Sequence, residues 1–136
     1  MIKAVFFDLW GTLVKAQEKS PNKQIAKLFG MDKETEEKVR QFSNSRKFRN
    51  FDDFLKELEK LIKKQVTPEI RREIEDVIRQ DNEFMDVYSD VYKTLKRLKE
   101  IGLRIGVISN TWQFSVNALF QKTELEKYVD EFILSY

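Results

Sequence analysis

The 136-residue sequence contains no cysteine and no histidine. The lack of cysteine excludes a disulfide framework and a thiolate nucleophile. The lack of both residues excludes a zinc site of the Cys/His kind, and without histidine there is no Ser-His-Asp triad and no imidazole general base. Any catalysis must therefore use carboxylates, lysine, tyrosine, hydroxyls, backbone amides or a cation bound by oxygen ligands.

Glycine is also scarce, and the four glycines have a spacing that fits neither the GxGxxG nor the GxxxxGK[ST] phosphate-binding loop. Long apolar runs are lacking as well, so no segment can span a bilayer. Asp8 interrupts the only early apolar run, which removes the pattern of a secretory signal. We therefore expect a cytoplasmic protein with no membrane partner.

The residues that are present are typical of a soluble globular domain. Hydrophobic residues make up 41% of the chain, with 11 Phe, and charged residues make up 35% with a net charge of +2. This balance gives little reason to expect nucleic acid. The local basic excess at Arg46, Lys47 and Arg49 is typical of a solvated helix end. The nearby phenylalanines at 42, 48, 51 and 54 are typical of a core between helices.

Three short apolar runs predict strands, at residues 2–7, 103–108 and 132–134. The first two are continuous, so we expect strands that are buried on both faces of a parallel sheet. Helical spacing predicts helices at about 91–98 and 114–119.

Residues 15–85 show helical spacing and no strand pattern. The expected helix starts are Ser20-Pro21, a site near Asp32, Asp52-Asp53 and Thr67-Pro68, with Gly30 ending the first helix and Phe42 near the end of the second. The fold class is therefore α/β: a doubly wound, Rossmann-like parallel sheet formed by residues 1–14 and 86–136, with an all-helical cap inserted at 15–85 and an incomplete sheet.

Polar residues follow the first two predicted strands. Ligands of open parallel sheets bind beyond the carboxyl ends of the strands. Asp8 and Ser109 are the first residues past the first two predicted strands, and Thr12 flanks them. Taken alone, an Asp in the position of Asp8 is typical of a turn or a helix cap. Ser109-Asn110 taken alone is typical of an ordinary loop start. The backbone amides expected to bind an anion there are those of Leu9, Trp10 and Asn110.

Two stretches carry a family resemblance. Residues 5–13 (VFFDLWGTL) resemble the first motif of the haloacid dehalogenase-like hydrolase superfamily, and residues 105–110 (IGVISN) resemble its second motif. Residues 88–102 are similar to the helix that precedes that second motif, and the helical insert stands where the family has its cap. The resemblance implies a parallel α/β sheet and hydrolysis through an aspartate nucleophile.

The resemblance also implies residue roles. Asp8 would attack the substrate and form a covalent aspartyl ester or acyl phosphate. Thr12 would hold the Asp8 loop, Ser109 would bind a substrate or phosphoryl oxygen, and Asn110 would help to bind the carboxylate of a haloacid. In the phosphatases of the family, Mg²⁺ is held partly by the nucleophile and by the backbone carbonyl two residues on, here Asp8 and Trp10; a dehalogenase would need no cofactor.

Trp10 departs from the phosphatase pattern. Phosphatases of the family have a second Asp at this position, which protonates the leaving group. The dehalogenase branch has an aromatic residue there, and halide leaves without a proton. Trp10 therefore favours a dehalogenase-type site over a phosphatase, unless it is only a packing residue under the cap.

The third and fourth motifs of the family, a Lys and a group of acidic residues, follow the third strand, and this chain ends at Tyr136. We therefore expect the N-terminal part of such an enzyme, inactive by itself, which self-associates or pairs with a missing C-terminal part. A non-catalytic remnant or interaction module is the alternative. For the enzyme we expect a small anionic substrate, attracted by Arg46 or Arg49.

Overall fold

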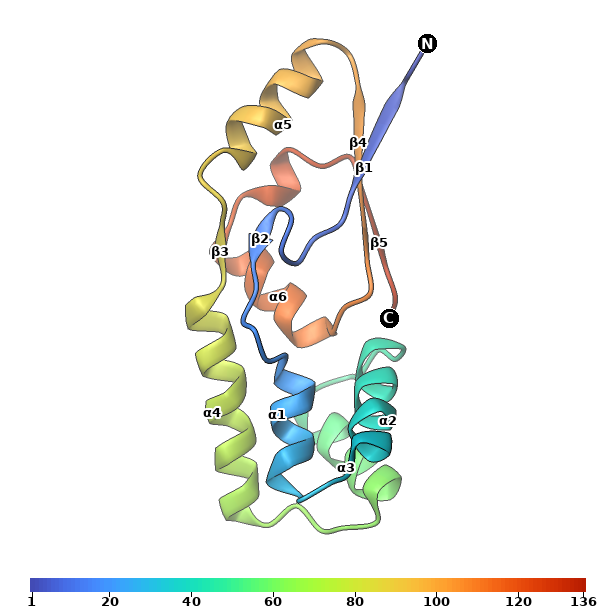
Figure 1. The fold of residues 1–136 in the computed structure, drawn as a ribbon, viewed down its shortest axis with the longest axis vertical. Helices are drawn as coiled ribbons and strands as arrows, with labels where there is room; N and C mark the ends of the chain where they lie inside the picture. Colours follow the sequence, from blue (N-terminus) through green and yellow to red (C-terminus); the bar gives the residue numbers. More distant parts are fainter.

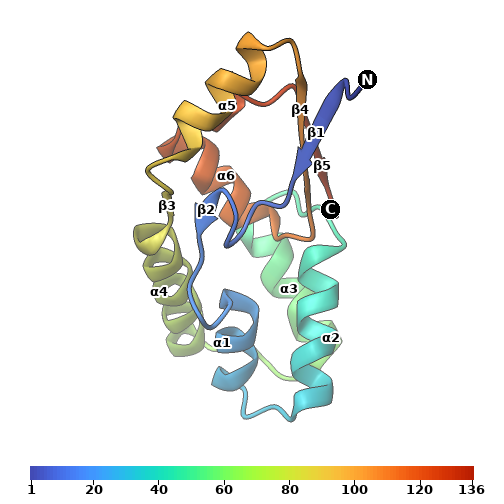
Figure 2. The same ribbon diagram turned by 45° about the horizontal axis from the view of Figure 1, so that its top comes forward.

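A computed structural model describes all residues from Met1 to Tyr136. In Figure 1 a sheet with its helices occupies one end of the molecule and a group of helices the other, and the turned view of Figure 2 shows the same division. The first part contains β1 (Ala4–Phe7), α5 (Val91–Glu100), β4 (Arg104–Ser109), α6 (Gln113–Lys122), a 3₁₀ turn (Leu125–Lys127) and β5 (Glu131–Leu134). The second contains α1 (Pro21–Leu28), α2 (Lys33–Asn44), α3 (Phe51–Ile62) and α4 (Pro68–Phe84).

The main sheet has the order β1-β4-β5, and all its strands are parallel. Phe7 of β1 lies opposite Val107 of β4, which lies opposite Phe132 of β5. The α/β class with a parallel sheet and a helical insert is confirmed. Because β1 is an edge strand beside β4, the carboxyl ends of the two strands that carry the predicted site are neighbours.

The prediction that the strands are buried on both faces is wrong. The helices α5 and α6 lie on one side of the sheet (Figure 1), and the side chains of Ile105 and Val107 on that side are buried. On the opposite face, Phe6 is 55%, Ile108 51% and Ile133 46% exposed. The strands carry apolar side chains on both faces of the sheet, but helices of this chain cover only one face.

A second correction concerns the two ends of the helical insert. Val14–Lys15 (β2) and Asp86–Val87 (β3) form an antiparallel pair, so Lys15 is in a strand although no strand pattern was predicted from residue 15 onward. A two-residue strand is too short to show alternation. The pair joins the segments that leave and re-enter the α/β part, and Lys15 forms an ion pair with Asp86 over 3.3 Å.

The helices of the insert follow their predicted start and stop signals. The Asp32 side chain caps α2 by accepting from the Thr35 N–H, and the Thr67 side chain caps α4. Gly30, with φ +63°, follows the end of α1. Two ends differ from prediction: α2 continues to Asn44, and α3 begins at Phe51 with Asn50 as its cap, which places two carboxylates in its first turn.

Each part has its own hydrophobic core. Leu9, Leu95, Val107 and Leu119 are among the buried residues of the α/β core. The helical core includes Ile25, Val39, Leu58 and Ile74 together with Phe42, Phe48 and Phe54, which confirms the interpretation of these phenylalanines as core. Trp112, in the segment after β4, packs into the helical core, with its ring 5.2 Å from that of Phe54.

None of the six α-helices combines the length and the apolar character that crossing a membrane requires.

Candidate active site at the strand ends

Asp8 directly follows β1, and its side chain is exposed. A tight turn holds the next residues. The buried Leu9 accepts hydrogen bonds at its carbonyl from the N–H groups of Leu13 (2.9 Å) and Val14 (3.0 Å). Gly11 donates to the Val14 carbonyl over 2.7 Å and has φ +76°, a conformation that strains other residues. The turn therefore fixes Asp8 at the carboxyl end of its strand.

Thr12 lies on the outside of this turn. Its backbone N–H donates to the Leu9 carbonyl over 3.4 Å, and its side chain is exposed and makes no hydrogen bond. Backbone contacts therefore account for the shape of the loop, and the predicted role of the Thr12 side chain stays a prediction.

Ser109 is the last residue of β4 rather than the first residue past it, because it still pairs with Leu134 of β5 and accepts at its carbonyl from Ser135. The residue is 5% exposed, and its hydroxyl has no hydrogen-bond partner. A buried hydroxyl without a partner is costly unless an external group satisfies it. The predicted binding role of Ser109 is compatible with this orphaned hydroxyl.

The backbone N–H groups of Leu9, Trp10 and Asn110 donate to no backbone carbonyl. They follow β1 and β4, whose ends are adjacent in the register that pairs Phe7 with Val107. Such unpaired amides beside a carboxylate nucleophile can stabilise the oxygens of an anion, as in oxyanion and phosphate sites.

Trp10 and the segment after β4 are connected by hydrogen bonds. The indole N–H of Trp10 donates to Oγ1 of the buried Thr111 over 2.8 Å. The Thr111 N–H donates to Oγ of Ser135 over 3.0 Å, and the Ser135 hydroxyl donates to the Asn44 carbonyl at the end of α2. Thr111, Ser135 and Asn44 come from segments far apart in the sequence, and no local pattern indicates their connection.

A cavity of about 160 Å³ lies where the two parts meet. Asp8, Thr12 and Ser109 do not line it, and neither does any lysine or arginine. Its lining from the α/β part is Trp10, Asn110, Thr111, Trp112 and Ser115, and from the insert and its entry Ala16, Gln17, Ser20, Pro21, Asn22, Asn44 and Asp81.

Asp81 is the only charged residue of this lining. Burial raises the pKa of its carboxyl, and a hydrogen bond from the Ser115 hydroxyl, over 3.1 Å, partly opposes that effect. No sequence pattern indicates Asp81, because it is one acid among many on α4 and it is buried through its contact with Ser115 of α6.

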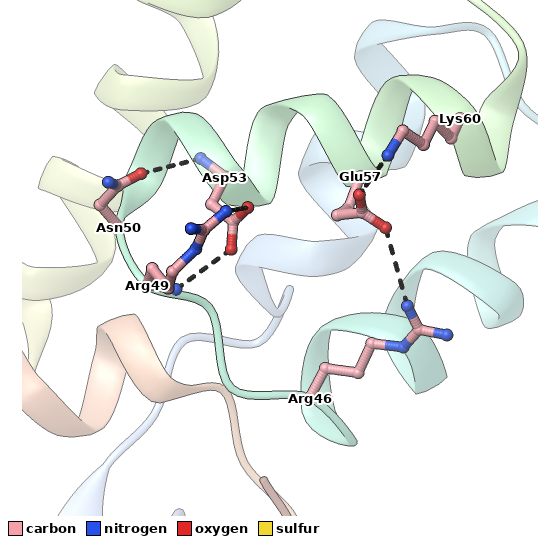
Figure 3. A network of polar contacts seen from close by, with 6 residues as sticks. All are labelled: Arg46, Arg49, Asn50, Asp53, Glu57 and Lys60. Carbon is pink, nitrogen blue, oxygen red and sulfur yellow. Dashed lines mark hydrogen bonds and ion pairs between the residues drawn. The ribbon is translucent and has the colours of Figure 1, made fainter.

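Arg46 and Arg49 point toward carboxylates of α3 (Figure 3). The Arg46 guanidinium lies 3.9 Å from Glu57 and stacks 5.3 Å from the centre of the Phe42 ring. Arg49 donates to Asp53 from its backbone N–H (3.2 Å) and its guanidinium (3.3 Å), and these bonds lower the pKa of the Asp53 carboxyl. Neither arginine lines the cavity beside Trp10 and Asn110, and the predicted role of Arg46 or Arg49 in attracting an anionic substrate stays a prediction.

No three acidic side chains gather into a metal centre. The predicted Mg²⁺ ligands fit as a partial set: the Asp8 carboxylate is exposed, and the Trp10 carbonyl accepts no backbone hydrogen bond. Mg²⁺ in proteins commonly takes one or two carboxylates and keeps several waters.

Solved structures with the same fold come from several bacteria. A HAD family enzyme from Bacteroides thetaiotaomicron, in complex with magnesium and inorganic phosphate, has a TM-score of 0.66 at 18% identity over 100% of this chain and 70% of its own. A predicted phosphoglycolate phosphatase from Haemophilus somnus 129pt has a TM-score of 0.55 at 18% identity over 98% of this chain and 63% of its own. A protein from Thermotoga maritima assigned as a β-phosphoglucomutase has a TM-score of 0.56 at 15% identity over 98% and 62%.

A sequence search of curated proteins finds no significant match. A family profile, in contrast, matches residues 2–136, which is nearly the whole chain. This match contains both motifs and the helical insert between them, and it agrees with the fold of the solved structures. The chain belongs to the haloacid dehalogenase-like hydrolases.

Proposed function

We propose that Asp8 is the nucleophile of a hydrolytic site that accepts a phosphoryl group and passes it to water. The observation that carries this proposal is the surroundings of Asp8. An exposed carboxylate stands at the end of β1, beside backbone amides without acceptors and the orphaned Ser109 hydroxyl. A phosphoryl group offers several oxygens to such donors.

The reaction would run in two displacements. An oxygen of Asp8 attacks phosphorus, the bond to the leaving oxygen breaks, and an acyl phosphate forms on Asp8. Water then attacks this intermediate, which releases inorganic phosphate and restores the carboxylate. The N–H groups of Leu9, Trp10 and Asn110 and the Ser109 hydroxyl would hold the phosphoryl oxygens in both steps.

Trp10 restricts the leaving group. Its indole N–H is engaged with Thr111, and an indole is not a useful acid. The site therefore suits substrates whose leaving group departs as a stable anion, such as acyl phosphates. Asp8 and the Trp10 carbonyl would hold Mg²⁺, which would neutralise charge on the phosphoryl group; the magnesium and phosphate in the structurally similar Bacteroides enzyme support this assignment.

Carbon–halogen cleavage by Asp8 is the second candidate, and Trp10 at the position of the second phosphatase Asp favours it. In that reaction Asp8 would displace halide from carbon, and water would hydrolyse the resulting ester. The cavity beside Trp10 and Asn110 disfavours a haloacid substrate. It has no basic side chain to bind the substrate carboxylate, and Asp81 in its lining would repel that carboxylate.

Trapping of the covalent intermediate tests both candidates. The chain is incubated for a long period with acetyl phosphate and Mg²⁺, or with chloroacetate, and its mass and labelled peptide are determined. We expect slow, stoichiometric phosphorylation at Asp8 and none in Asp8→Asn; a carboxymethyl ester at Asp8 instead, formed as chloride leaves, would establish the dehalogenase reaction.

Asp90→Asn is the matched control, since Asp90 is an exposed acid before α5, outside the strand-end site. It should label like the wild type. Labelling of another residue, or no adduct from either reagent, would refute the nucleophile and favour the non-catalytic alternative.

A further inference from the structure

A second pocket, of about 630 Å³, lies between α3, α4 and α6 and shares no lining residue with the cavity beside Trp10 and Asn110. Its apolar lining consists of Phe51 of α3, Ile78 of α4 and Phe114 of α6, and all three side chains are only half-buried. A volume of about 300–1,000 Å³ is typical of pockets that bind small molecules. The pocket therefore has the size and the apolar surface of a ligand site, and the strand-end chemistry does not use it.

The rings of Phe51 and Phe114 form a right-angled corner in this lining. Their planes are inclined by 87°, and their centroids lie 5.9 Å apart. Aromatic rings prefer edge-to-face or offset stacked contacts, so a third ring in this corner can face one phenylalanine while it directs its edge at the other. An aliphatic group of the same size gains no such contact. The corner therefore favours an aromatic ligand.

The charged groups of the lining already have partners within the protein. Glu75 pairs with Arg71 over 2.9 Å, and Arg79 pairs with Glu83 over 3.0 Å. The Lys122 ammonium donates to three backbone carbonyls at the end of α4. The carboxylates and the cations of the lining also balance one another in number. A charged ligand would lose its hydration without finding a free counter-ion, so the pocket favours an uncharged one.

One polar group of the lining remains without a partner. Oδ1 of Asn82 is buried and accepts no hydrogen bond, although the Asn82 backbone carbonyl accepts from Lys122. A buried acceptor without a donor is costly, and an O–H or N–H group of a ligand removes that cost. The last torsion of an Asn side chain is soft, so Oδ1 can turn toward a donor in the pocket. The ligand therefore needs a hydrogen-bond donor in addition to its ring.

We propose that this pocket binds a small uncharged aromatic molecule that carries a hydrogen-bond donor, with Phe51 and Phe114 holding the ring and Asn82 accepting from the donor. Only three of the eight lining residues are apolar. That is a small apolar surface beside the roughly 800 Å² that each partner buries in a stable protein interface, so a second copy of the chain is a less suitable occupant. The ligand contacts α3 and α4 of the insert and α6 of the α/β part, and it therefore links the two parts.

Trp112 reports on the pocket without lining it, because its ring lies 5.2 Å from that of Phe114 in an edge-to-face contact. Tryptophan fluorescence is measured during titration with five probes of similar size. Benzyl alcohol has the ring and the donor, its isomer anisole lacks the donor, and cyclohexylmethanol lacks the aromatic ring. Benzoate and benzylammonium add a charge. We expect a saturable change with benzyl alcohol at a concentration about tenfold lower than with any other probe.

Variants assign the contacts. Phe51→Leu keeps an apolar side chain but removes one ring of the corner, so it should weaken benzyl alcohol binding about fivefold or more. Asn82→Leu removes the acceptor and should abolish the preference for benzyl alcohol over anisole. Phe84→Leu is the matched control and should bind like the wild type, because Phe84 is a half-exposed phenylalanine of α4 outside the lining.

Asp8→Asn separates this inference from the proposed function. Asp8 lies outside the pocket, so this variant should bind benzyl alcohol like the wild type even though phosphorylation is lost. Circular dichroism checks that each variant is folded; should Phe51→Leu fail to fold, the order of the five probes in the wild type decides.

Three results would overturn the inference. The first is binding of a charged probe, anisole or cyclohexylmethanol that is as tight as that of benzyl alcohol, or a response that does not saturate. The second is equal binding by Phe51→Leu and Phe84→Leu. The third is a Phe51→Leu variant that changes only the association of the chain in sedimentation velocity, because the pocket would then be a contact between copies.

Discussion

The indole N–H of Trp10 donates a hydrogen bond of 2.8 Å to the hydroxyl of Thr111, 101 positions later in the chain. The bond ties the turn after β1 to the segment after β4. Oγ1 of Thr111 accepts no other hydrogen bond, and the backbone N–H of Thr111 donates to Oγ of Ser135. The two strand-end loops and the end of the chain therefore form one connected unit. Asp8 lies two residues before Trp10, where the chain enters this unit.

A double-mutant cycle tests this connection. Thr111→Val keeps the shape of the side chain and removes the acceptor, so the free energy of unfolding should fall by about 1–3 kcal/mol as the Trp10 N–H is left unpaired. Trp10→Phe removes the donor. The double variant should lose less than the sum of the two single losses, as measured by urea unfolding followed by circular dichroism.

Thr12→Val is the control for this cycle, since the Thr12 side chain is exposed and makes no hydrogen bond. Its unfolding free energy should stay within about 0.5 kcal/mol of the wild type. Strictly additive effects of the Trp10 and Thr111 substitutions would show that the bond carries no coupling.

Steady-state turnover by the 136-residue chain is expected to be undetectable. Lys15 and Lys122 are not free to neutralise charge between Asp8 and a substrate, because Lys15 pairs with Asp86 and the Lys122 ammonium donates to carbonyls at the end of α4, those of Asn82, Glu83 and Met85. Assays with phosphoesters and haloacids, with and without Mg²⁺, should give only the slow labelling described above. Saturable turnover that disappears in Asp8→Asn would contradict this prediction.

Much of the fold could be predicted because its signals are local. Asp32 and Thr67 cap helices through residues three positions on, and Gly30 ends α1 through its own conformation. The strand ending before Asp8 was likewise visible as an apolar run. These features need no knowledge of the rest of the chain.

The features that sequence reasoning missed depend on partners far away. Phe6 lies in an apolar run, but its exposure depends on which side of the sheet α5 and α6 cover. Asp81 becomes a cavity residue only because α4 packs against α6, where Ser115 donates to it. The predicted roles of Asp8, Ser109 and Asn110 required a family resemblance, since each has an ordinary structural explanation when taken alone.

Asp130 should give the stability of the sheet a pH dependence. Its carboxylate accepts from Lys99 (2.8 Å) and from the backbone N–H of Ile105 (2.7 Å) at the start of β4. The bond from Lys99 and that from Ile105 lower the pKa of Asp130 below 3.8. Because the folded state prefers the ionised form, the stabilisation is complete above pH 3.8 and is lost as the pH falls through the lowered pKa.

Denaturant unfolding of Asp130→Asn between pH 7 and pH 2 tests this dependence. The variant should be less stable than the wild type at neutral pH, and the difference should shrink below about pH 4 as the wild-type carboxylate is protonated. Glu131→Gln, an exposed neighbour without an ion pair, serves as the control and should follow the wild type. A difference that stays constant down to pH 2 would contradict the assigned cause.

The last prediction concerns association of the chain with a second copy. Phe6, Ile108 and Ile133 form an exposed apolar face across the three strands, and the outer edge of β1 pairs with nothing. Natural edge strands are protected by charge or proline, and near β1 only Lys3 offers this. We therefore expect a dimer or larger assembly whose size rises with concentration, as measured by sedimentation velocity.

A pair of opposite charges introduced on the exposed face should prevent this association. Ile108 and Ile133 lie opposite each other in the register of β4 and β5, so Ile108→Lys with Ile133→Glu places opposite charges across the strands at little cost to folding. This double variant should be monomeric, whereas Ile101→Lys, at an exposed position beyond the end of α5, should associate like the wild type. A wild-type monomer at high concentration, with β1 amides strongly protected from hydrogen exchange, would mean that the edge and the face are already covered within one chain, because unpaired amides at an open edge exchange quickly.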